Sequence, residues 1–120
     1  MTNTLETSAN PLISSDRVEG TTVYNAQGDK LGSVDCVMLD KQQGKVAYAV
    51  MGFGGFLGIG EEHYPVPWNA LDYDPARDGF RTNIDEATVK GAPERTEQWH
   101  SDRAWQERTF DHYGVPYYWL

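Results

Sequence analysis

Short runs of strand-forming residues, separated by turn residues, are the feature that most constrains the fold of this chain. β-branched, aromatic and aliphatic residues gather in five stretches, which are 21–24, 31–39, 46–51, 64–68 and 80–84. Gly, Asn, Asp and Pro fall between them, and turn signals every ~8–12 residues are typical of a small barrel or sandwich. The pattern predicts a mainly β fold, a small antiparallel β-barrel with a short helix and a C-terminal helical extension.

The two longest stretches differ in how many faces they bury. In 31–39, Val34, Cys36 and Met38 recur at every second position, which predicts one apolar face. The stretch 46–51 is apolar at every position, so we expect both of its faces to be covered.

Five glycines lie between residues 52 and 60, which raises the question of a phosphate-binding loop. Such a loop needs Lys and Ser or Thr after its last glycine, but Glu61 and Glu62 stand there. Pro65 and Pro67 also forbid the helix that should follow. We therefore interpret the glycines as positions at which a strand bends sharply around a barrel corner.

Cap and stop signals predict helices near the C-terminus. Asp85 as N-cap and Gly91 as stop predict a short helix over 86–90. Three aromatic residues of the stretch 94–113 fall on one helical stripe, and Gly114 follows as a stop signal. With the polar residues 1–11 expected to be disordered, these signals divide the chain into a barrel domain, 12–93, and an extension, 94–120.

Residues 56–71, Phe-Leu-Gly-Ile-Gly-Glu-Glu-His-Tyr-Pro-Val-Pro-Trp-Asn-Ala-Leu, resemble the central signature of PRC-barrel domains. The segments 12–16, 23–33 and 85–93 occur in the same order as in that family, and the ending 113–120 resembles its stand-alone bacterial members. The family is named for the photosynthetic reaction centre H subunit and includes the C-terminal domain of a ribosome maturation factor. The resemblance implies a small antiparallel barrel that binds proteins and has no shared catalytic residues.

The reactive side chains form no catalytic or metal-binding pattern. Glu61 and His63 can share a strand face, but two ligands are too few for a structural zinc site. The stretch 72–78 has the acidic spacing of a calcium loop, but it lacks an acidic ligand and the central glycine. Cys36 lies on an apolar face and is expected to be a small core residue. We expect no enzyme activity, no cofactor and no metal.

The charge of the chain restricts its partners. The formal net charge is −8, from 10 basic and 18 acidic residues, which disfavours binding to nucleic acid and to anionic membranes. No apolar run approaches the ~20 residues of a membrane span. A single cysteine and an N-terminus without a signal-peptide pattern indicate a cytoplasmic protein.

Seven aromatic residues lie in the last 27 residues and must dock on the barrel or on a second copy of it. We expect a non-enzymatic interaction module that forms a homodimer, with an interface drawn from Tyr48, Phe53, Phe56, Leu57, Trp99, Trp105, Phe110, Tyr113, Tyr117, Tyr118 and Trp119. Two alternatives stay open, a ribosome- or RNA-processing-associated factor and a barrel that binds a small ligand or metal through residues 61–63.

Overall fold

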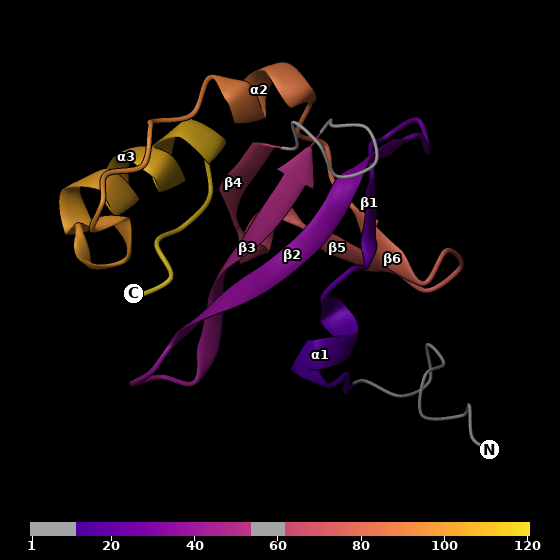
Figure 1. Cartoon of the computed structure of the whole chain (residues 1–120), viewed down its shortest axis with the longest axis horizontal. Helices are drawn as coiled ribbons and strands as arrows, with labels where there is room; N and C mark the ends of the chain where they lie inside the picture. The colour runs from indigo at the N-terminus through magenta and orange to yellow at the C-terminus, as the bar shows by residue number, and fades with distance from the viewer. Residues whose placement is uncertain (1–11, 54–61) are drawn as a thin grey trace.

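The computed structural model describes residues 12–53 and 62–120, so the predictions for residues 1–11 and for Phe56 and Leu57 lie outside the described residues. The elements, in chain order, are α1 (Ser15–Val18), β1 (Thr22–Tyr24), β2 (Lys30–Asp40), β3 (Lys45–Phe53), β4 (Glu62–Pro67), the 3₁₀ helix η2 (Trp68–Ala70), β5 (Asp72–Asp74), β6 (Gly79–Arg81), α2 (Glu86–Lys90), the 3₁₀ helix η3 (Trp99–Ser101) and α3 (Arg103–Tyr113). Figure 1 shows α2 and α3 beside β3 and β4, with α1 beyond β2. The fold is mainly β, as predicted.

The sheet departs from the predicted antiparallel barrel in two ways. Its strand order is β4-β3-β2-β1-β6-β5, and β1 pairs with β6 in parallel, so the sheet is mixed. Within the described residues the end strands β4 and β5 do not pair, and the barrel is not closed. The physical reason lies in the end strands. Pro65 and Pro67 of β4 have no N–H to offer a neighbour, and β5 is only three residues long.

The main core lies on one face of the sheet. Its buried residues are Val18, Val23, Val34, Ala49, Met51, Phe53, Val66, Leu71, Phe80 and Val89. The long strands β2 and β3 approach closely because Gly32 has no side chain. A Cβ at this position would overlap the carbonyl oxygen of Gly52.

The predicted single apolar face of β2 is wrong. The pairing with β3 shifts register between Val34 and Cys36, and a residue inserted into a strand moves the following side chains to the other face. As a result Val34 is buried in the main core, whereas Met38 packs against a second cluster on the opposite face. The prediction for β3 is confirmed, because seven consecutive residues from Ala47 to Phe53 are buried.

The signals for the short helix near the C-terminus are confirmed, whereas the predicted stripe in 94–113 is not one helix, because Trp99 lies in η3 and α3 begins at Arg103. Helix α2 is capped by Asp85, whose carboxylate accepts a hydrogen bond from the backbone N–H of Thr88 at 2.8 Å, and it ends at Gly91. Hydrogen bonding to the charged form lowers the pKa of Asp85, with the Thr88 side chain and backbone as the main donors. Gly44 adopts the left-handed conformation that ends the turn between β2 and β3.

Candidate functional site: an apolar sheet face and its aromatic arm

Residues 94–120, here called the arm, pack mainly on the far face of β3, while Tyr113 reaches the main core. Helix α3 starts where the Asp102 carboxylate accepts a hydrogen bond from the backbone N–H of Trp105 at 3.1 Å. It ends at Gly114, which is left-handed with a φ of 70°. Helix α3 therefore has its own start and stop signals in the local sequence.

Four aromatic rings of the arm surround the ring of Tyr48 on β3. The distances from the Tyr48 centroid to the other centroids are 5.2–6.1 Å, for Trp99, Trp105, Phe110 and Tyr118. Tyr48 is 3% exposed, and Trp105 and Phe110 are buried with it. We call these four rings the aromatic box. Offset and edge-on aromatic pairs at such distances add about 0.5–1.5 kcal/mol each to simple burial.

The hydroxyl of Tyr48 has no hydrogen-bond partner among the described residues, although it is buried. Burial raises the pKa of Tyr48, because the low-dielectric surroundings disfavour the phenolate. A neutral, unpaired hydroxyl in this position costs about 1–3 kcal/mol relative to a paired one. Packing of the ring, not its polar end, must therefore hold Tyr48 in the box.

The last residues of the chain close the box from outside. The Tyr118 hydroxyl donates a hydrogen bond to Oε1 of Gln106 at 2.9 Å, and Tyr117 donates to the Asp111 carboxylate at the same distance. The Arg103 guanidinium lies 3.7 Å from the centroid of the Trp119 ring, at the distance of a cation–π contact. The Trp119 ring also stacks on the ring of Tyr117. These contacts tie the C-terminal residues to α3.

Two hydrogen bonds link α3 to the segment before it. The Trp105 indole N–H donates to the carbonyl oxygen of Pro93 at 3.2 Å. Nε2 of His112 lies 2.7 Å from the carbonyl oxygen of Thr88 in α2. The arm is thus attached to the rest of the protein by Tyr48 and its neighbours on the sheet, by Tyr113 at the main core and by a few polar contacts.

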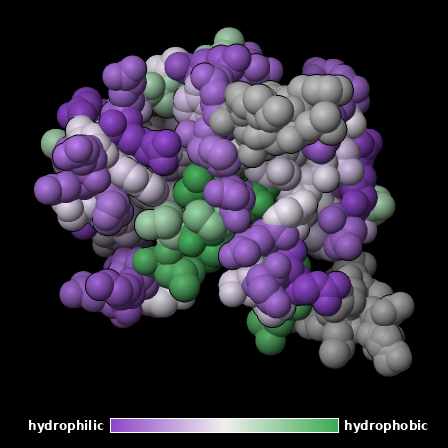
Figure 2. All heavy atoms as spheres, in the orientation of Figure 1, coloured by the Kyte–Doolittle hydropathy of each residue, from purple (hydrophilic) through white to green (hydrophobic). Residues whose placement is uncertain are grey.

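The strands β2 and β3 carry further apolar residues beside Tyr48. Two cross-strand pairs place four residues on its face, which are Cys36 with Val50 and Met38 with Tyr48. We call this set the apolar band. A second register shift, in which Ala47 is the extra residue of β3, separates the band from the next pair, Leu39 with Val46. Tyr48 and Val50 are buried, whereas Leu39 is 57% exposed and Val46 is half-buried. Figure 2 shows hydrophobic side chains gathered over β2 and β3 beside the arm. The two strands are thus covered at the band and open to solvent at the hairpin end.

The residues predicted as an interface fall into two groups. Tyr48, Trp99, Trp105, Phe110, Tyr117, Tyr118 and Trp119 come together in or around the box. Phe53 and Tyr113 instead lie at the main core, where Phe53 is buried against Tyr64. Their role between copies stays a prediction. Sequence reasoning missed Leu39 and Val46, since the two register shifts between β2 and β3 are not visible in the spacing of apolar residues.

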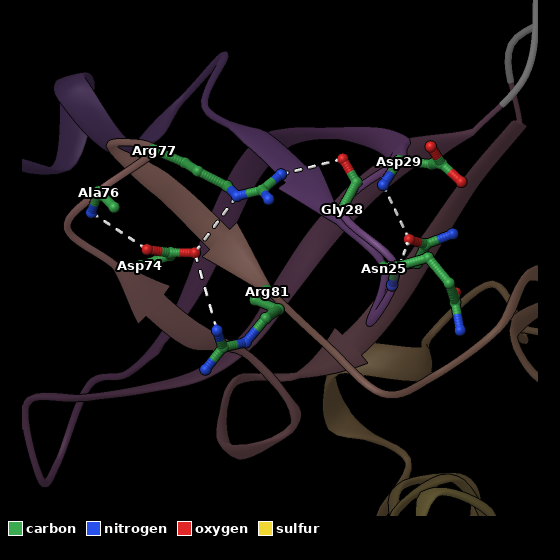
Figure 3. A network of polar contacts seen from close by, with 8 residues as sticks. Asn25, Gly28, Asp29, Asp74, Ala76, Arg77 and Arg81 are labelled. Atoms are coloured by element: carbon green, nitrogen blue, oxygen red, sulfur yellow. Dashed lines mark hydrogen bonds and ion pairs between the residues drawn. The ribbon is translucent and has the colours of Figure 1, made fainter.

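A second polar feature joins two turns at the other end of the sheet (Figure 3). Arg77 donates a hydrogen bond to the carbonyl oxygen of Gly28 at 3.0 Å, and the Asp74 carboxylate lies within ion-pair distance of Arg77 and Arg81. The Asn25 side chain accepts two backbone hydrogen bonds at 2.9 Å within its own turn. Because these arginines share a carboxylate, their charge is partly balanced, and the network serves to hold the turns together.

A cleft of about 430 Å³ separates β4 from the start of the arm. Its walls include Glu62, His63, Lys90 and Arg95. Lys90 pairs with Glu86 at 2.9 Å and lies 3.8 Å from Glu62. Within the described residues, no three His, Cys, Asp or Glu side chains are placed to hold a metal ion.

The helices of the described chain, 12–53 and 62–120, include none that is both long and apolar enough to cross a membrane. Helix α3, with 11 residues, is well short of the ~20 residues that a bilayer requires.

The sequence matches a known protein family over more than half of its length. Among curated proteins no match was found. One solved structure that matches is a putative 16S ribosomal RNA processing protein, RimM, from Pseudomonas aeruginosa, with 20% identity and a TM-score of 0.43. The match covers 64% of this chain, which spans about half of the RimM chain (46%). The PRC-barrel domain family matches residues 11–89, which is more than half of the sequence. On this match, and on the mainly β fold described above, the chain belongs to the PRC-barrel domain family.

Proposed function

We propose that this protein is a non-enzymatic protein-interaction module that self-associates through the exposed apolar end of the β2–β3 hairpin. The observation that carries the proposal is Leu39, a large aliphatic side chain that is 57% exposed and is paired with the half-buried Val46 directly beyond the apolar band. Isolated exposed side chains are ordinary, but an exposed apolar pair next to a covered apolar strip is typical of an interaction surface.

Charges of both signs lie at the hairpin end of β2 and β3, which suits contact with a second copy of the chain. Asp40 lies beside Lys41 and is paired across the strands with Lys45, so both signs of charge border the open end. A two-fold interface brings the same patch together with itself, and a border of one sign would repel its own copy. In this proposal the domain comprises residues 12–93, and the arm is an appended element.

Two other functions have less support in the described residues. A ribosome- or RNA-associated factor needs a basic face, but Arg77 and Arg81 are paired with Asp74 in a chain of net charge −8. A small ligand that binds in the cleft beside β4 through Lys90 would have to compete with Glu86 and Glu62, which already pair with this side chain.

Light scattering after size exclusion tests the proposal. We expect the wild-type protein to have the mass of two chains and Leu39→Glu to have the mass of one. Ile13→Glu is the matched control, because Ile13 is 54% exposed but precedes α1. A dimer that survives Leu39→Glu, or a wild-type monomer at every concentration, would contradict the proposal.

A further inference from the structure

We propose that two copies of this protein pair edge to edge along the second half of β2, so that their sheets join. This inference rests on the proposed function, because it names how the exposed hairpin ends of two copies meet. The partner of residues 37–39 is the same stretch of a second chain, which runs antiparallel to it about a two-fold axis beside Met38. The edge concerned is the one that faces away from β3.

The second half of β2 has a neighbouring strand on only one side. β3 pairs with β2 as far as the hairpin turn. On the other side β1 pairs with β2 only as far as Ser33, and the loop before β1 adds two hydrogen bonds to the backbone of Val34, at 2.7 and 2.9 Å. Beyond Val34, no strand within residues 12–53 and 62–120 pairs with β2 on this side. Figure 1 shows this part of the hairpin projecting past β1.

The free edge offers regularly spaced hydrogen-bonding groups. Successive residues of an antiparallel strand direct their backbone N–H and C=O groups alternately to one side and to the other. Pro67 of β4 has no N–H, so Tyr48, which is paired with it on β3, directs its own groups to β2 instead. Its partner there is Met38. The residues on either side of Met38, Val37 and Leu39, therefore direct two donors and two acceptors to the free edge.

A second copy of the same stretch satisfies all four groups. With the axis beside Met38, Val37 of each copy lies opposite Leu39 of the other, and each such pair exchanges two backbone hydrogen bonds. Side chains of directly opposite residues lie on the same face and contact each other. Leu39, which is 57% exposed, thus packs on Val37, which is half-buried at the border of the main core. The pair buries the side chain that carries the proposed function.

The same register places opposite charges together. Asp35 of each copy comes opposite Lys41 of the other, and both residues are exposed. Any extended peptide can bond to the four backbone groups, but only a peptide with a base and apolar residues at the matching positions fits the whole edge. The chain itself has this pattern, which favours a second copy as the partner. Each copy uses its one free stretch of β2, so the pair is closed.

Charge reversal at the two ends of the paired stretch tests the register. Asp35→Lys and Lys41→Glu each set two like-charged pairs opposite one another in the dimer. We expect each variant to dimerise at least about tenfold more weakly than the wild type in analytical ultracentrifugation. The double variant should recover the wild-type affinity, because both pairs are again of opposite sign. Lys30→Glu is the matched control, since it makes the same change at the other end of β2, beside β1, and should leave the affinity unchanged.

Hydrogen exchange followed by NMR tests the backbone pairing. The amides of Val37 and Leu39 should exchange slowly at concentrations where the wild type is dimeric and quickly in Lys41→Glu at the same concentration. All these side chains lie at the surface, so circular dichroism should show an intact fold in every variant.

The outcomes separate this inference from the proposed function. Edge pairing is overturned if the wild type is dimeric and Leu39→Glu monomeric, but the charge reversals do not weaken the dimer or the double variant does not recover. Rapid exchange of both amides in the dimer overturns it as well. In these cases the hairpin end remains the interface. A wild-type protein that is monomeric at every concentration overturns both proposals.

Discussion

The unpaired hydroxyl of Tyr48 leads to a prediction in which the sign of the effect is informative. Tyr48→Phe removes a buried polar atom that has no partner, so no hydrogen bond is lost. Leaving such a group buried costs about 1–3 kcal/mol, so we expect Phe at this position to raise the free energy of unfolding by about 1 kcal/mol. Tyr48→Ala empties the box instead. Loss of a large buried aromatic side chain lowers stability by about 3–5 kcal/mol.

The matched control is Tyr118, which lies in contact with Tyr48 and whose hydroxyl is paired. It donates to Gln106 at 2.9 Å, so Tyr118→Phe should lower the free energy of unfolding by about 1 kcal/mol. The same chemical change therefore has opposite signs at two neighbouring positions. If only the polarity of the ring mattered, and not its hydrogen bond, the free energy of unfolding of both variants would change in the same direction.

Urea unfolding followed by tryptophan fluorescence measures these changes. Trp99 and Trp105 both contact Tyr48, with centroids 5.9 and 5.8 Å away, so their emission reports on the box. The midpoint and the slope should be fitted together, because a changed slope would indicate altered compactness of a state rather than altered stability. If Tyr48→Phe lowers the free energy of unfolding by 1 kcal/mol or more, the hydroxyl has a partner and the reasoning is refuted.

Three further predictions test other parts of the structure. Burial raises the pKa values of Tyr48 and Tyr113, so the folded protein favours the neutral phenols. The stability that this preference provides is complete below pH 10, the ordinary pKa of tyrosine, and is lost as the pH rises above that value. A spectroscopic titration should show these tyrosines ionising together with release of the arm, and ionisation near pH 10 in a folded protein would be inconsistent with their burial. Asp102→Ala should lower the stability of α3 by about 1 kcal/mol while Asp102→Asn, which keeps a capping oxygen, changes it little, as followed by far-ultraviolet circular dichroism. Gly32→Ala places a methyl group against the facing strand and should lower the free energy of unfolding by about 1–3 kcal/mol or more. Gly44 lies in open space but is left-handed, so Gly44→Ala should lower it by about 1–2 kcal/mol. Urea unfolding measures both changes, and equal losses of stability would argue against close contact of the strands.

The predictable parts of the fold were those decided by neighbouring residues. Helix α2 follows from Asp85, a few helical residues and Gly91, and all of these act within two turns. The position of β4 at the edge of the sheet agrees with Pro65 and Pro67, which are unsuited to a central strand. The two-sided burial of β3 follows from its unbroken apolar sequence.

The parts that escaped prediction depend on residues far apart in the sequence. The parallel pair of β1 and β6 joins Val23 to Phe80, and no local signal encodes that choice. The bulge in β2 arises from how the strand fits β3, and it decides that Met38 faces the arm side of the sheet. At the candidate site the aromatic residues were visible, but their gathering around Tyr48 depends on a turn at Trp99 that precedes α3.

The end strands of the sheet also limit how large an assembly can grow. Addition of chains along a sheet requires a long free border with regularly placed donors and acceptors. β4 carries two prolines that interrupt its donors, and β5 at the opposite end has three residues. Copies of this protein therefore have little means of extending the sheet at its two ends, so self-association should yield pairs of defined size in place of fibrils.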